Sequence, residues 1–472
     1  MVADRPICIL LGALGGQGGG VLADWLVEAA HHSGYPAQAT STPGVAQRTG
    51  ATTYYFELFP EKNPPGEPIF TLFPGTGDLD IIAALEPTEA GRSLERGYIT
   101  ETTTVITGTE RVYSTAEKMA AGDGTINDKP MIGIANTFSE AVHCNSHLRI
   151  LADHVKKGVI AAGATPIEFP VISLGEFFLS PTSMYLRNQM SIDIEEMIKG
   201  LPIDGVIILT GCDKTTPAAI MGAASANIPT IILPGGPSLK GNWRGEELGS
   251  CTDCRRYWNE LRAGNISQED YDSMEESIYR SPGFCMVSGT ASTMACITEA
   301  MGMTLVGAAT LPAVDSRRMA LANRSGQQIV NLVKNNVRFE NFLHRENFLN
   351  GIVTLMALGG STNAIIHLLA IAGRTKTKIS LDDFNQVSEN TPVLANLKPA
   401  GSKLMEDFHY AGGVSALLKN IKHLLNIETK SVSGQNLKDI LDQAENFDEQ
   451  VIRDLSLIHI SEPTRPERIG GR

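Results

Sequence analysis

Short apolar segments alternate with longer segments of helical periodicity along most of this 472-residue chain. We expect strands at 131–135, 165–172, 205–209 and 230–233, and helices at 145–161, 184–199, 216–225, 347–358 and 362–372. Two parallel strands need a long crossover between them, which a helix supplies. This order therefore predicts an α/β fold, with a parallel sheet covered by helices on both faces. After about residue 283 the chain is expected to be mostly helical.

The composition agrees with a globular α/β protein and excludes several functions. Glycine is frequent (46 residues) and aromatic residues make up only 6%, which favours tight strand-to-helix turns over a β-sandwich. The net charge of −13 repels phosphate backbones and anionic lipids, and so argues against nucleic-acid and membrane-surface roles. The sequence has no apolar run long enough to span a membrane and no N-terminal signal pattern, so we expect a cytoplasmic protein.

Changes in pattern divide the chain into four parts. Residues 1–120 are expected to form one α/β domain, 121–128 a linker or junction, 129–454 a larger α/β/α domain, and 455–472 an unstructured tail. The tail has no periodicity, and residues 456–465 resemble the translation of a common sequencing adapter. We therefore expect the tail to carry no function and the genuine reading frame to depart from it near residue 453.

A glycine-rich turn follows the first expected strand, at 7–11, and precedes a helix at 21–32. The turn contains Gly15, Gly16, Gln17 and Gly18. Such a turn lets backbone N–H groups approach a phosphate, but tight packing of the helix on the strand requires the same glycines. A nicotinamide cofactor would also need an acidic residue about 20 residues further on, and the segment 37–44 has none, so NAD binding is not expected.

This turn and the segment PGVAQR at 43–48 resemble the gamma domain of 2-oxoacid:ferredoxin oxidoreductases, in particular the beta subunit of indolepyruvate oxidoreductase. The resemblance covers about residues 5–120. It implies an incomplete, Rossmann-like domain that belongs to a larger thiamine-diphosphate enzyme and does no chemistry alone. Cys8 lies inside the first strand and is expected to be a core thiol.

The seven cysteines are too sparse for a disulfide scaffold, and an odd number cannot all pair. Cys144, Cys212 and Cys285 each stand in a turn before a helix. Because the carboxyl ends of parallel strands line a ligand-binding crevice, these three thiols could meet there. No short motif connects them, so metal ligands, inert core thiols and a nucleophile all remain open.

The segment TGCDKTTP at 210–217 follows an expected strand directly. Cys212 is a soft ligand and Asp213 beside it a hard one, which suggests two different metals in one site. Lys214 and the helix N-terminus would lower the pKa of the thiol. The alternative is a buried thiol next to a surface ion pair.

Four segments, in the right order, resemble the dihydroxy-acid and sugar-acid dehydratases (the IlvD/Edd family). They are PMIGIANTFSEAVHCN at 130–145, GCDK at 211–214, GGSTN at 359–363 and MEDF at 405–408. The segment WRGEELG at 243–249 resembles the sugar-acid branch, which includes arabonate and xylonate dehydratases. The resemblance extends from about residue 129 to 453 and implies a three-layer α/β/α domain. The β-barrel domain that follows it in the family is expected to be absent.

The resemblance also implies the cofactors. Cys144, Cys212 and Cys285 would hold an iron–sulfur cluster, 2Fe–2S rather than 4Fe–4S, and Glu176, Asp213 and Lys214 would hold Mg²⁺, the lysine as a carbamate. Such a site converts a 2,3-dihydroxy acid to a 2-oxo-3-deoxy acid: Mg²⁺ holds the carboxylate and 2-hydroxyl, and iron assists loss of the 3-hydroxyl. The serine base of the family lies in the barrel, so no catalytic base is expected here. The chain as written should then bind a cluster without dehydrating a substrate. The intact family enzymes are homo-oligomers.

The remaining candidates are weaker. Cys251 and Cys254 have zinc-like spacing, but two further ligands are not evident, so exposed loop thiols are expected. Cys296 is expected in the core. His143 and His147 are expected to pack or hydrogen-bond rather than to ligate.

Three functional hypotheses follow. The first is the iron–sulfur, Mg²⁺-dependent dehydratase, a hydro-lyase acting on a small 2,3-dihydroxy acid. The second is a subunit of a 2-oxoacid (indolepyruvate):ferredoxin oxidoreductase, which depends on thiamine diphosphate and ferredoxin. The third is a non-functional chimera created by an assembly error.

Overall fold

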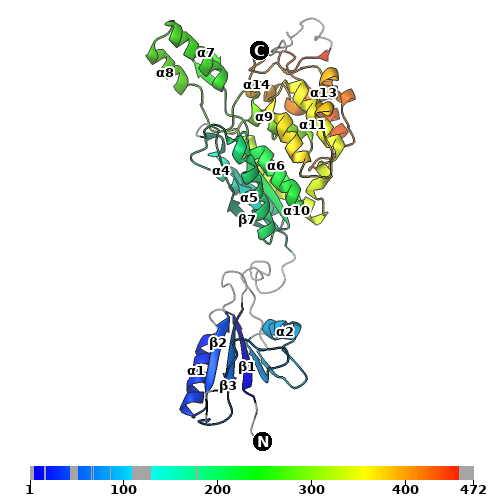
Figure 1. The fold of residues 1–472 in the computed structure, drawn as a ribbon. Coiled ribbons are helices and arrows are strands. Elements are labelled where there is room, and N and C mark those ends of the chain that lie inside the picture. Colours follow the sequence, from blue (N-terminus) through cyan, green and yellow to red (C-terminus); the bar gives the residue numbers. More distant parts are fainter. Residues whose placement is uncertain are drawn as a thin grey trace. The chain divides into compact units, whose positions relative to one another are not determined.

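The computed structural model describes residues 5–14, 18–42, 51–64, 66, 68–85, 87–108, 129–176 and 179–455. The chain forms two compact units, Met1–Asp128 and Lys129–Arg472 (Figure 1). The predicted linker at 121–128 and the tail from 456 onward lie outside the described residues. Among the described helices, none is both long and apolar enough to cross a membrane.

The first unit contains a mixed five-stranded sheet. Its order is β2-β3-β1-β4-β5, with β1 (Ile7–Leu14), β2 (Ala37–Thr42), β3 (Ala51–Leu58), β4 (Ile81–Ala84) and β5 (Thr104–Thr107). Strands β1, β4 and β5 are parallel, whereas β3 is antiparallel to both β1 and β2. Two helices, α1 (Gly19–His32) and α2 (Pro87–Glu95), complete the described part of this unit.

The parallel arrangement predicted from the alternation is therefore wrong for β2 and β3. Only residues 43–50 join these two strands, and that connection is too short for a parallel crossover. As a result β3 separates β2 from β1, whereas a Rossmann sheet places the first two strands side by side.

The glycine-rich turn lies mostly outside the described residues, which exclude Gly15, Gly16 and Gln17. Gly18 is described and precedes α1 with a φ of 78°, a conformation that favours glycine. The helix predicted at 21–32 is confirmed. Cys8 is a core thiol as expected, since it is buried in β1.

The second unit is built on a four-stranded parallel sheet of order β7-β6-β8-β9. Its strands are β6 (Met131–Asn136), β7 (Thr165–Pro170), β8 (Gly205–Thr210) and β9 (Thr230–Pro234), and all four predicted strands are confirmed. Strands β6, β8 and β9 are buried along their whole length, as expected for apolar strands of a covered parallel sheet.

Helices pack against this sheet in two pairs. One pair is α4 (Leu148–Ala161) with α10 (Ser316–Lys334), and the other is α5 (Arg187–Gly200) with α6 (Thr215–Ala226). The helices that follow residue 283 form the rest of the unit, as predicted: α9 (Thr290–Ala300), α11 (Arg345–Leu358), α12 (Asn363–Ala372), α13 (Leu381–Asn390), α14 (Met405–Tyr410), α15 (Gly413–Asn420) and α16 (Leu437–Gln443).

Two glycines allow α4 and α10 to pack in close contact. A Cβ atom added at Gly158 would lie 1.9 Å from the carbonyl oxygen of Asn323, and one at Gly326 would lie 2.3 Å from that of Val155. Both obstacles are backbone atoms, which cannot move aside as a side chain can.

We expect Gly158→Ala to lower the free energy of unfolding of the second unit by about 1–3 kcal/mol, because the two helices must separate. Gly200→Ala is the matched control, since nothing lies within 4 Å of its added Cβ atom at the end of α5. Urea unfolding followed by circular dichroism measures both variants. Equal stability of the two would contradict the close contact.

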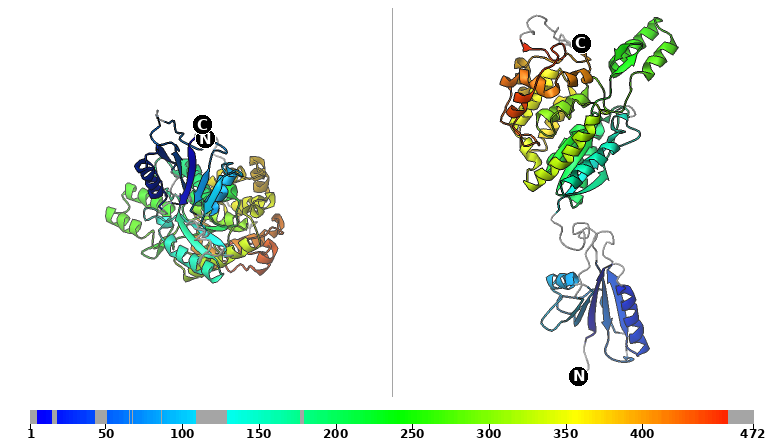
Figure 2. Two further views of the ribbon diagram at one scale, coloured as in Figure 1. Left: turned by 90° about the horizontal axis from the view of Figure 1, so that it is seen from below. Right: turned by 180° about the vertical axis from the view of Figure 1, so that it is seen from behind.

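A small two-helix extension, here called the arm (residues 241–276), stands apart from the rest of the second unit in two views (Figures 1 and 2). It consists of the hairpin β10 (Gly241–Trp243) and β11 (Glu246–Leu248), then α7 (Ser250–Ala263) and α8 (Gln268–Glu276). The arm has its own apolar cluster, made of Leu248, Tyr257, Tyr271, Met274, Ile278, Met286, Val287 and Leu404. The last four residues of that cluster lie outside the arm and attach it to the rest of the unit.

A fully buried arginine lies in the interior of the second unit. Arg318, in the first turn of α10, is 0% exposed. Its guanidinium donates hydrogen bonds to the carbonyl oxygens of Pro234 (2.9 Å), Ala308 (2.8 Å) and Leu311. Burial lowers its pKa to about 9.

A buried glutamate binds the same loop from α9. The Glu299 carboxylate accepts hydrogen bonds from the backbone N–H groups of Gly307 and Ala309, both at 2.9 Å. Burial raises its pKa to about 6, against the opposing effect of these bonds and of the Arg318 charge. Together the two side chains connect β9, α9 and α10 through the loop at 307–311.

Candidate metal and cluster site

The topology of the second sheet brings the first two candidate cysteines together. Strands β6 and β8 are neighbours, but the chain runs from β6 to β7 on one side and from β8 to β9 on the other. Such a switch in direction opens a crevice at the carboxyl ends of the two strands. Cys144 follows β6 and Cys212 follows β8, so both lie at this crevice.

Asn145 ties the two cysteine loops to each other. Its Oδ1 accepts a hydrogen bond from the backbone N–H of Cys212 (2.9 Å), and its Nδ2 donates to the carbonyl oxygen of Thr137 (2.9 Å) and to Oγ of Ser173 (2.8 Å). Gly211 permits this approach, because an added Cβ atom would lie 2.2 Å from Asn145 Oδ1 and 2.6 Å from the carbonyl oxygen of Cys144.

The thiols of Cys144 and Cys212 are in direct contact. Cys144 donates a hydrogen bond to the sulfur of Cys212, and this bond, together with burial, raises the pKa of Cys144 well above its usual range. The same bond lowers the pKa of Cys212. Cys285 and Asp213 also act electrostatically to raise the pKa of Cys144, so both lie in its neighbourhood.

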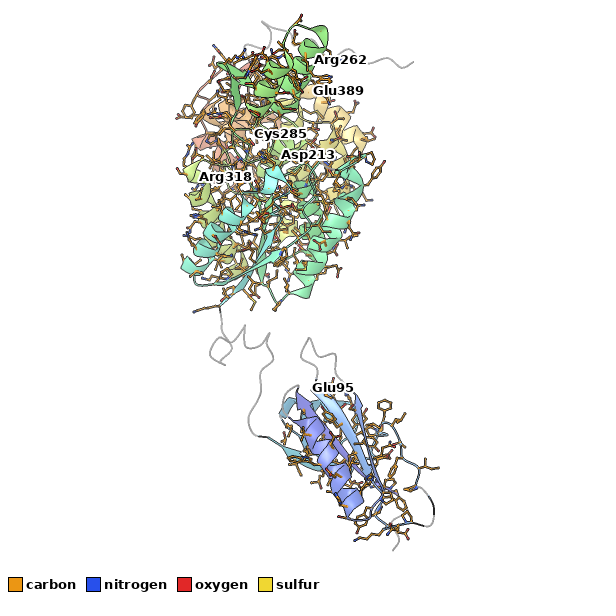
Figure 3. The ribbon with its side chains drawn as sticks, turned by 90° about the vertical axis from the view of Figure 1, so that its left-hand side faces the viewer. Glu95, Asp213, Arg262, Cys285, Arg318 and Glu389 are labelled. Carbon is orange, nitrogen blue, oxygen red and sulfur yellow. The ribbon has the colours of Figure 1, made fainter. Side chains whose placement is uncertain are left out.

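Cys285 is held beside this pair by His143. The ring Nε2 of His143 lies 3.0 Å from the carbonyl oxygen of Ser281, and its ring makes an edge contact with Tyr279, whose Oη is 3.5 Å from Cys285 Sγ. Figure 3 shows Cys285 and Asp213 close together inside the second unit. The expectation that His143 hydrogen-bonds is confirmed.

The proposed magnesium ligands form a second cluster next to the thiols. The Nζ atom of Lys214, whose side chain is only 2% exposed, lies 3.2 Å from Glu176 Oε2 and 3.6 Å from Asp213 Oδ2. Burial raises the pKa of Asp213. Burial also acts to raise the pKa of Glu176, but hydrogen bonds from Ser183 and Thr182 and the charge of Lys214 outweigh it, so that this pKa is lowered.

Asp213 and Cys285 line a cavity of about 640 Å³. Its lining residues come from the starts of α6, α7, α9 and α12: Asp213, Ser250, Thr252, Arg255, Cys285, Val287, Ser288, Gly289, Thr290, Gly359, Gly360, Ser361, Thr362 and Pro399. The GGSTN segment at 359–363 therefore contributes to this cavity, which agrees with its place among the four segments that resemble the dehydratases. A cavity of this size accommodates a small organic acid.

The donor set fits an iron–sulfur cluster and a hard cation better than one shared metal ion. Across the described residues, no three His, Cys, Asp or Glu side chains lie close enough together to hold a single metal ion. A cluster places its own iron and sulfide atoms between the thiolates, so its ligands need not converge on one point. The oxygen site has two carboxylates, and its third ligand would be the carbamate of Lys214.

The remaining candidate cysteine and histidine side chains that the structure describes pack or hydrogen-bond within the protein. Cys251 and Cys254 both lie on α7, so the expectation of a loop there is wrong. Cys254 is half-buried, with Sγ 3.5 Å from Tyr271 Oη, and not exposed as expected. The side chain of Cys251 lies outside what the structure describes. Cys296 is buried in α9 as expected. His147 Nε2 lies 2.9 Å from the carbonyl oxygen of Gly235, and burial lowers its pKa to about 4.

Comparison with known families decides the identity of the second unit. Residues 129–440 match the family "Dihydroxy-acid/6-phosphogluconate dehydratase N-terminal", which is well over half of the chain. The chain belongs to this dehydratase family. Its members are hydro-lyases, and two of the segments that resembled the family, GCDK at 211–214 and GGSTN at 359–363, contribute residues to one cavity.

Similarity to individual dehydratases supports this family assignment. A homologue from Rhizobium meliloti (strain 1021) is 48% identical over 71% of this chain and 58% of its own length. The L-arabonate dehydratase of Azospirillum brasilense is 46% identical over 71% and 58%. The 6-deoxy-6-sulfo-D-gluconate dehydratase of Pseudomonas putida is 44% identical over 69% and 56%. The chain thus spans somewhat more than half the length of these dehydratases.

The first unit is similar to a different family. Residues 8–165 match the family "Pyruvate ferredoxin/flavodoxin oxidoreductase", which agrees with the resemblance seen at the glycine-rich turn and overlaps the start of the dehydratase match. One chain therefore combines an oxidoreductase-like region with most of a dehydratase domain.

Proposed function

We propose that the second unit is the cofactor-binding, three-layer α/β/α domain of a sugar-acid dehydratase, which removes water from a 2,3-dihydroxy acid to give a 2-oxo-3-deoxy acid. The observation that supports this most is the pair of thiols Cys144 and Cys212, with Cys285 in their neighbourhood, beside the Lys214 carboxylate cluster. The sugar-acid branch is favoured by the similarity to L-arabonate dehydratase.

The chain's own residues would divide the work. Cys144, Cys212 and Cys285 would hold an iron–sulfur cluster, preferably 2Fe–2S, while Glu176, Asp213 and carbamylated Lys214 would hold Mg²⁺. When bound, these cofactors supply Lewis acids for the hydroxyl and carboxylate oxygens of the acid. Asn145 and His143 position the cysteine loops, and the buried walls around Lys214 exclude water from its nitrogen.

Cluster assembly tests this proposal. After anaerobic reconstitution with iron and sulfide, we expect the wild-type chain to show the visible absorption of an iron–sulfur cluster, and Cys212→Ser to lose most of it, because the variant lacks a thiolate at the centre of the site. Cys254→Ser is the matched control and should keep the signal, since Cys254 lies on the arm against Tyr271.

A wild-type chain that takes up no cluster would contradict the proposal. So would an equal loss of absorption in Cys212→Ser and Cys254→Ser. Chemical analysis for iron and sulfide, normalised to protein, separates a bound cluster from precipitated iron sulfide.

A second candidate function belongs to the first unit. The match of residues 8–165 to the oxidoreductase family favours a subunit of a 2-oxoacid:ferredoxin oxidoreductase. Co-purification with a thiamine-diphosphate-containing partner, and ferredoxin reduction by that complex, would support it. If no such partner co-purifies and no ferredoxin is reduced, while the chain still takes up a cluster, the oxidoreductase function is contradicted and the dehydratase proposal stands.

A further inference from the structure

His367, in the middle of α12, is a buried imidazole with one ring nitrogen engaged and the other without a partner. The residue is 0% exposed, and its Nδ1 lies 3.0 Å from Nη1 of Arg187 at the start of α5. Among the described residues, its Nε2 has no hydrogen-bond partner. A buried polar atom without a partner costs free energy, so native proteins rarely keep one. The Nε2 atom therefore indicates a partner that the unmodified chain does not provide.

The contact with Arg187 determines which ring nitrogen of His367 carries the proton. A guanidinium has only donors, so Nδ1 accepts a hydrogen bond from it and carries no proton itself. Burial, followed by the charges of Arg187 and Lys214, lowers the pKa of His367 to about 3, so the ring is neutral near pH 7. A neutral ring with a bare Nδ1 has its hydrogen on Nε2. The unpartnered atom is thus an N–H donor that needs an acceptor.

The same region of the unit contains Lys214. Helices α5 and α12, which carry Arg187 and His367, both pack against α6, and Lys214 immediately precedes α6. The charge of Lys214 acts on His367, and the Lys214 side chain is itself only 2% exposed. As an ammonium, Lys214 cannot satisfy the imidazole N–H, because an ammonium has three donors and no acceptor. Lys214 can serve this donor only after its end has become an acceptor.

Carbamylation makes that conversion. The uncharged Nζ of Lys214 attacks the carbon of CO₂: the N–C bond forms, the electron pair of one C–O π bond moves to oxygen, and one proton leaves the nitrogen for water. The product carries two oxygens that share one negative charge. One oxygen would bind the cation of the proposed site, and the other can still accept a hydrogen bond.

We propose that the Nε2–H of His367 binds an oxygen of the Lys214 carbamate and holds this ligand in place, while Arg187 fixes the tautomer that makes the bond possible. This inference rests on the proposed function, in which carbamylated Lys214 is a ligand of Mg²⁺. His367 and Arg187 are then positioning residues, which act through Lys214 and not on the substrate.

Carbamylation can be measured without turnover and without a cluster. The full chain is titrated with isotopically labelled bicarbonate and followed by carbon-13 NMR, and Lys214→Met identifies the carbamate resonance by removing it. We expect His367→Leu to raise the bicarbonate concentration for half-maximal carbamylation at least ~10-fold, because a hydrogen bond to a charged group is lost. His367→Gln should recover part of this loss, since its amide N–H can replace Nε2–H. Arg187→Met should have an intermediate effect, because the ring then divides its proton between both nitrogens.

His409→Leu is the matched control. The Nδ1 of His409 lies 3.0 Å from Thr310 Oγ1, and the charges that act on this ring belong to α10 and the residue before it, so its loss should leave carbamylation unchanged. Equal half-maximal concentrations for His367→Leu and His409→Leu would overturn the inference, as would a wild-type chain without a carbamate resonance.

Two further readouts keep the result interpretable. Circular dichroism shows whether His367→Leu remains folded. If it does not, Arg187→Met decides, because it keeps the imidazole, and carbamylation equal to the wild type would then count against the inference. Failure of the proposed function appears separately, as the absence of cluster absorption in the wild type.

Discussion

Replacing Arg318 by alanine is expected to lower the free energy of unfolding of the second unit by about 3–5 kcal/mol, the cost of removing one member of a buried charged network. The substitution removes the donors for the carbonyl oxygens of Pro234, Ala308 and Leu311. It also leaves the fully buried Glu299 without its neighbouring positive charge, which should raise the pKa of that carboxyl further. The cavity left by the guanidinium adds to the loss.

The neighbouring residue provides the control. Arg317 is the preceding residue of α10, but its side chain is 58% exposed and pairs with Asp315 at 2.6 Å. Arg317→Ala should therefore cost less than about 1 kcal/mol. Urea unfolding followed by circular dichroism compares the two variants under the same conditions. Comparable stabilities for Arg318→Ala and Arg317→Ala would show that the buried network contributes little.

Gly211→Ala is expected to prevent cluster assembly while leaving the three cysteines in the chain. The added methyl group would collide with Asn145 Oδ1 and with the carbonyl oxygen of Cys144. The hydrogen bond from the Cys212 N–H to Asn145 would break, and the loops that bear Cys144 and Cys212 would separate. We expect iron and sulfide content after reconstitution to fall at least ~10-fold, the effect of losing about 1.4 kcal/mol or more of site geometry.

Two comparisons make this result interpretable. Gly200→Ala, which meets no atom within 4 Å, should load as well as the wild type. Circular dichroism should show that Gly211→Ala retains its helices, so that a loss of cluster reports the site and not global unfolding. Normal cluster content in Gly211→Ala would contradict the role given to the Asn145 bridge.

The second unit was predictable from sequence because its signals are local. Apolar runs predicted the strands β6 to β9. The turns that follow β6 and β8 indicated that Cys144 and Cys212 lie at the crevice. The side to which the chain continues in the sheet, after β6 and after β8, depends on strand order, and no local sequence pattern encodes strand order. For the same reason the mixed sheet of the first unit was missed: strand periodicity does not distinguish a parallel neighbour from an antiparallel one.

Some site residues were missed for a different reason. Asn145 stands next to a candidate cysteine, and this adjacency was the available signal for its role.

The apolar cluster of the arm has a consequence for how the sequence of this unit can vary. Half of the cluster comes from the arm, and the arm joins the rest of the unit through Ile278, Met286, Val287 and Leu404 and through the ion pair of Asp253 with Lys398 (2.7 Å). Substitutions at exposed positions of the arm should therefore leave the sheet undisturbed, whereas substitutions at its base, which lines the cavity, should not. In related chains the outer face of the arm is thus the part of the second unit where the sequence can diverge most freely.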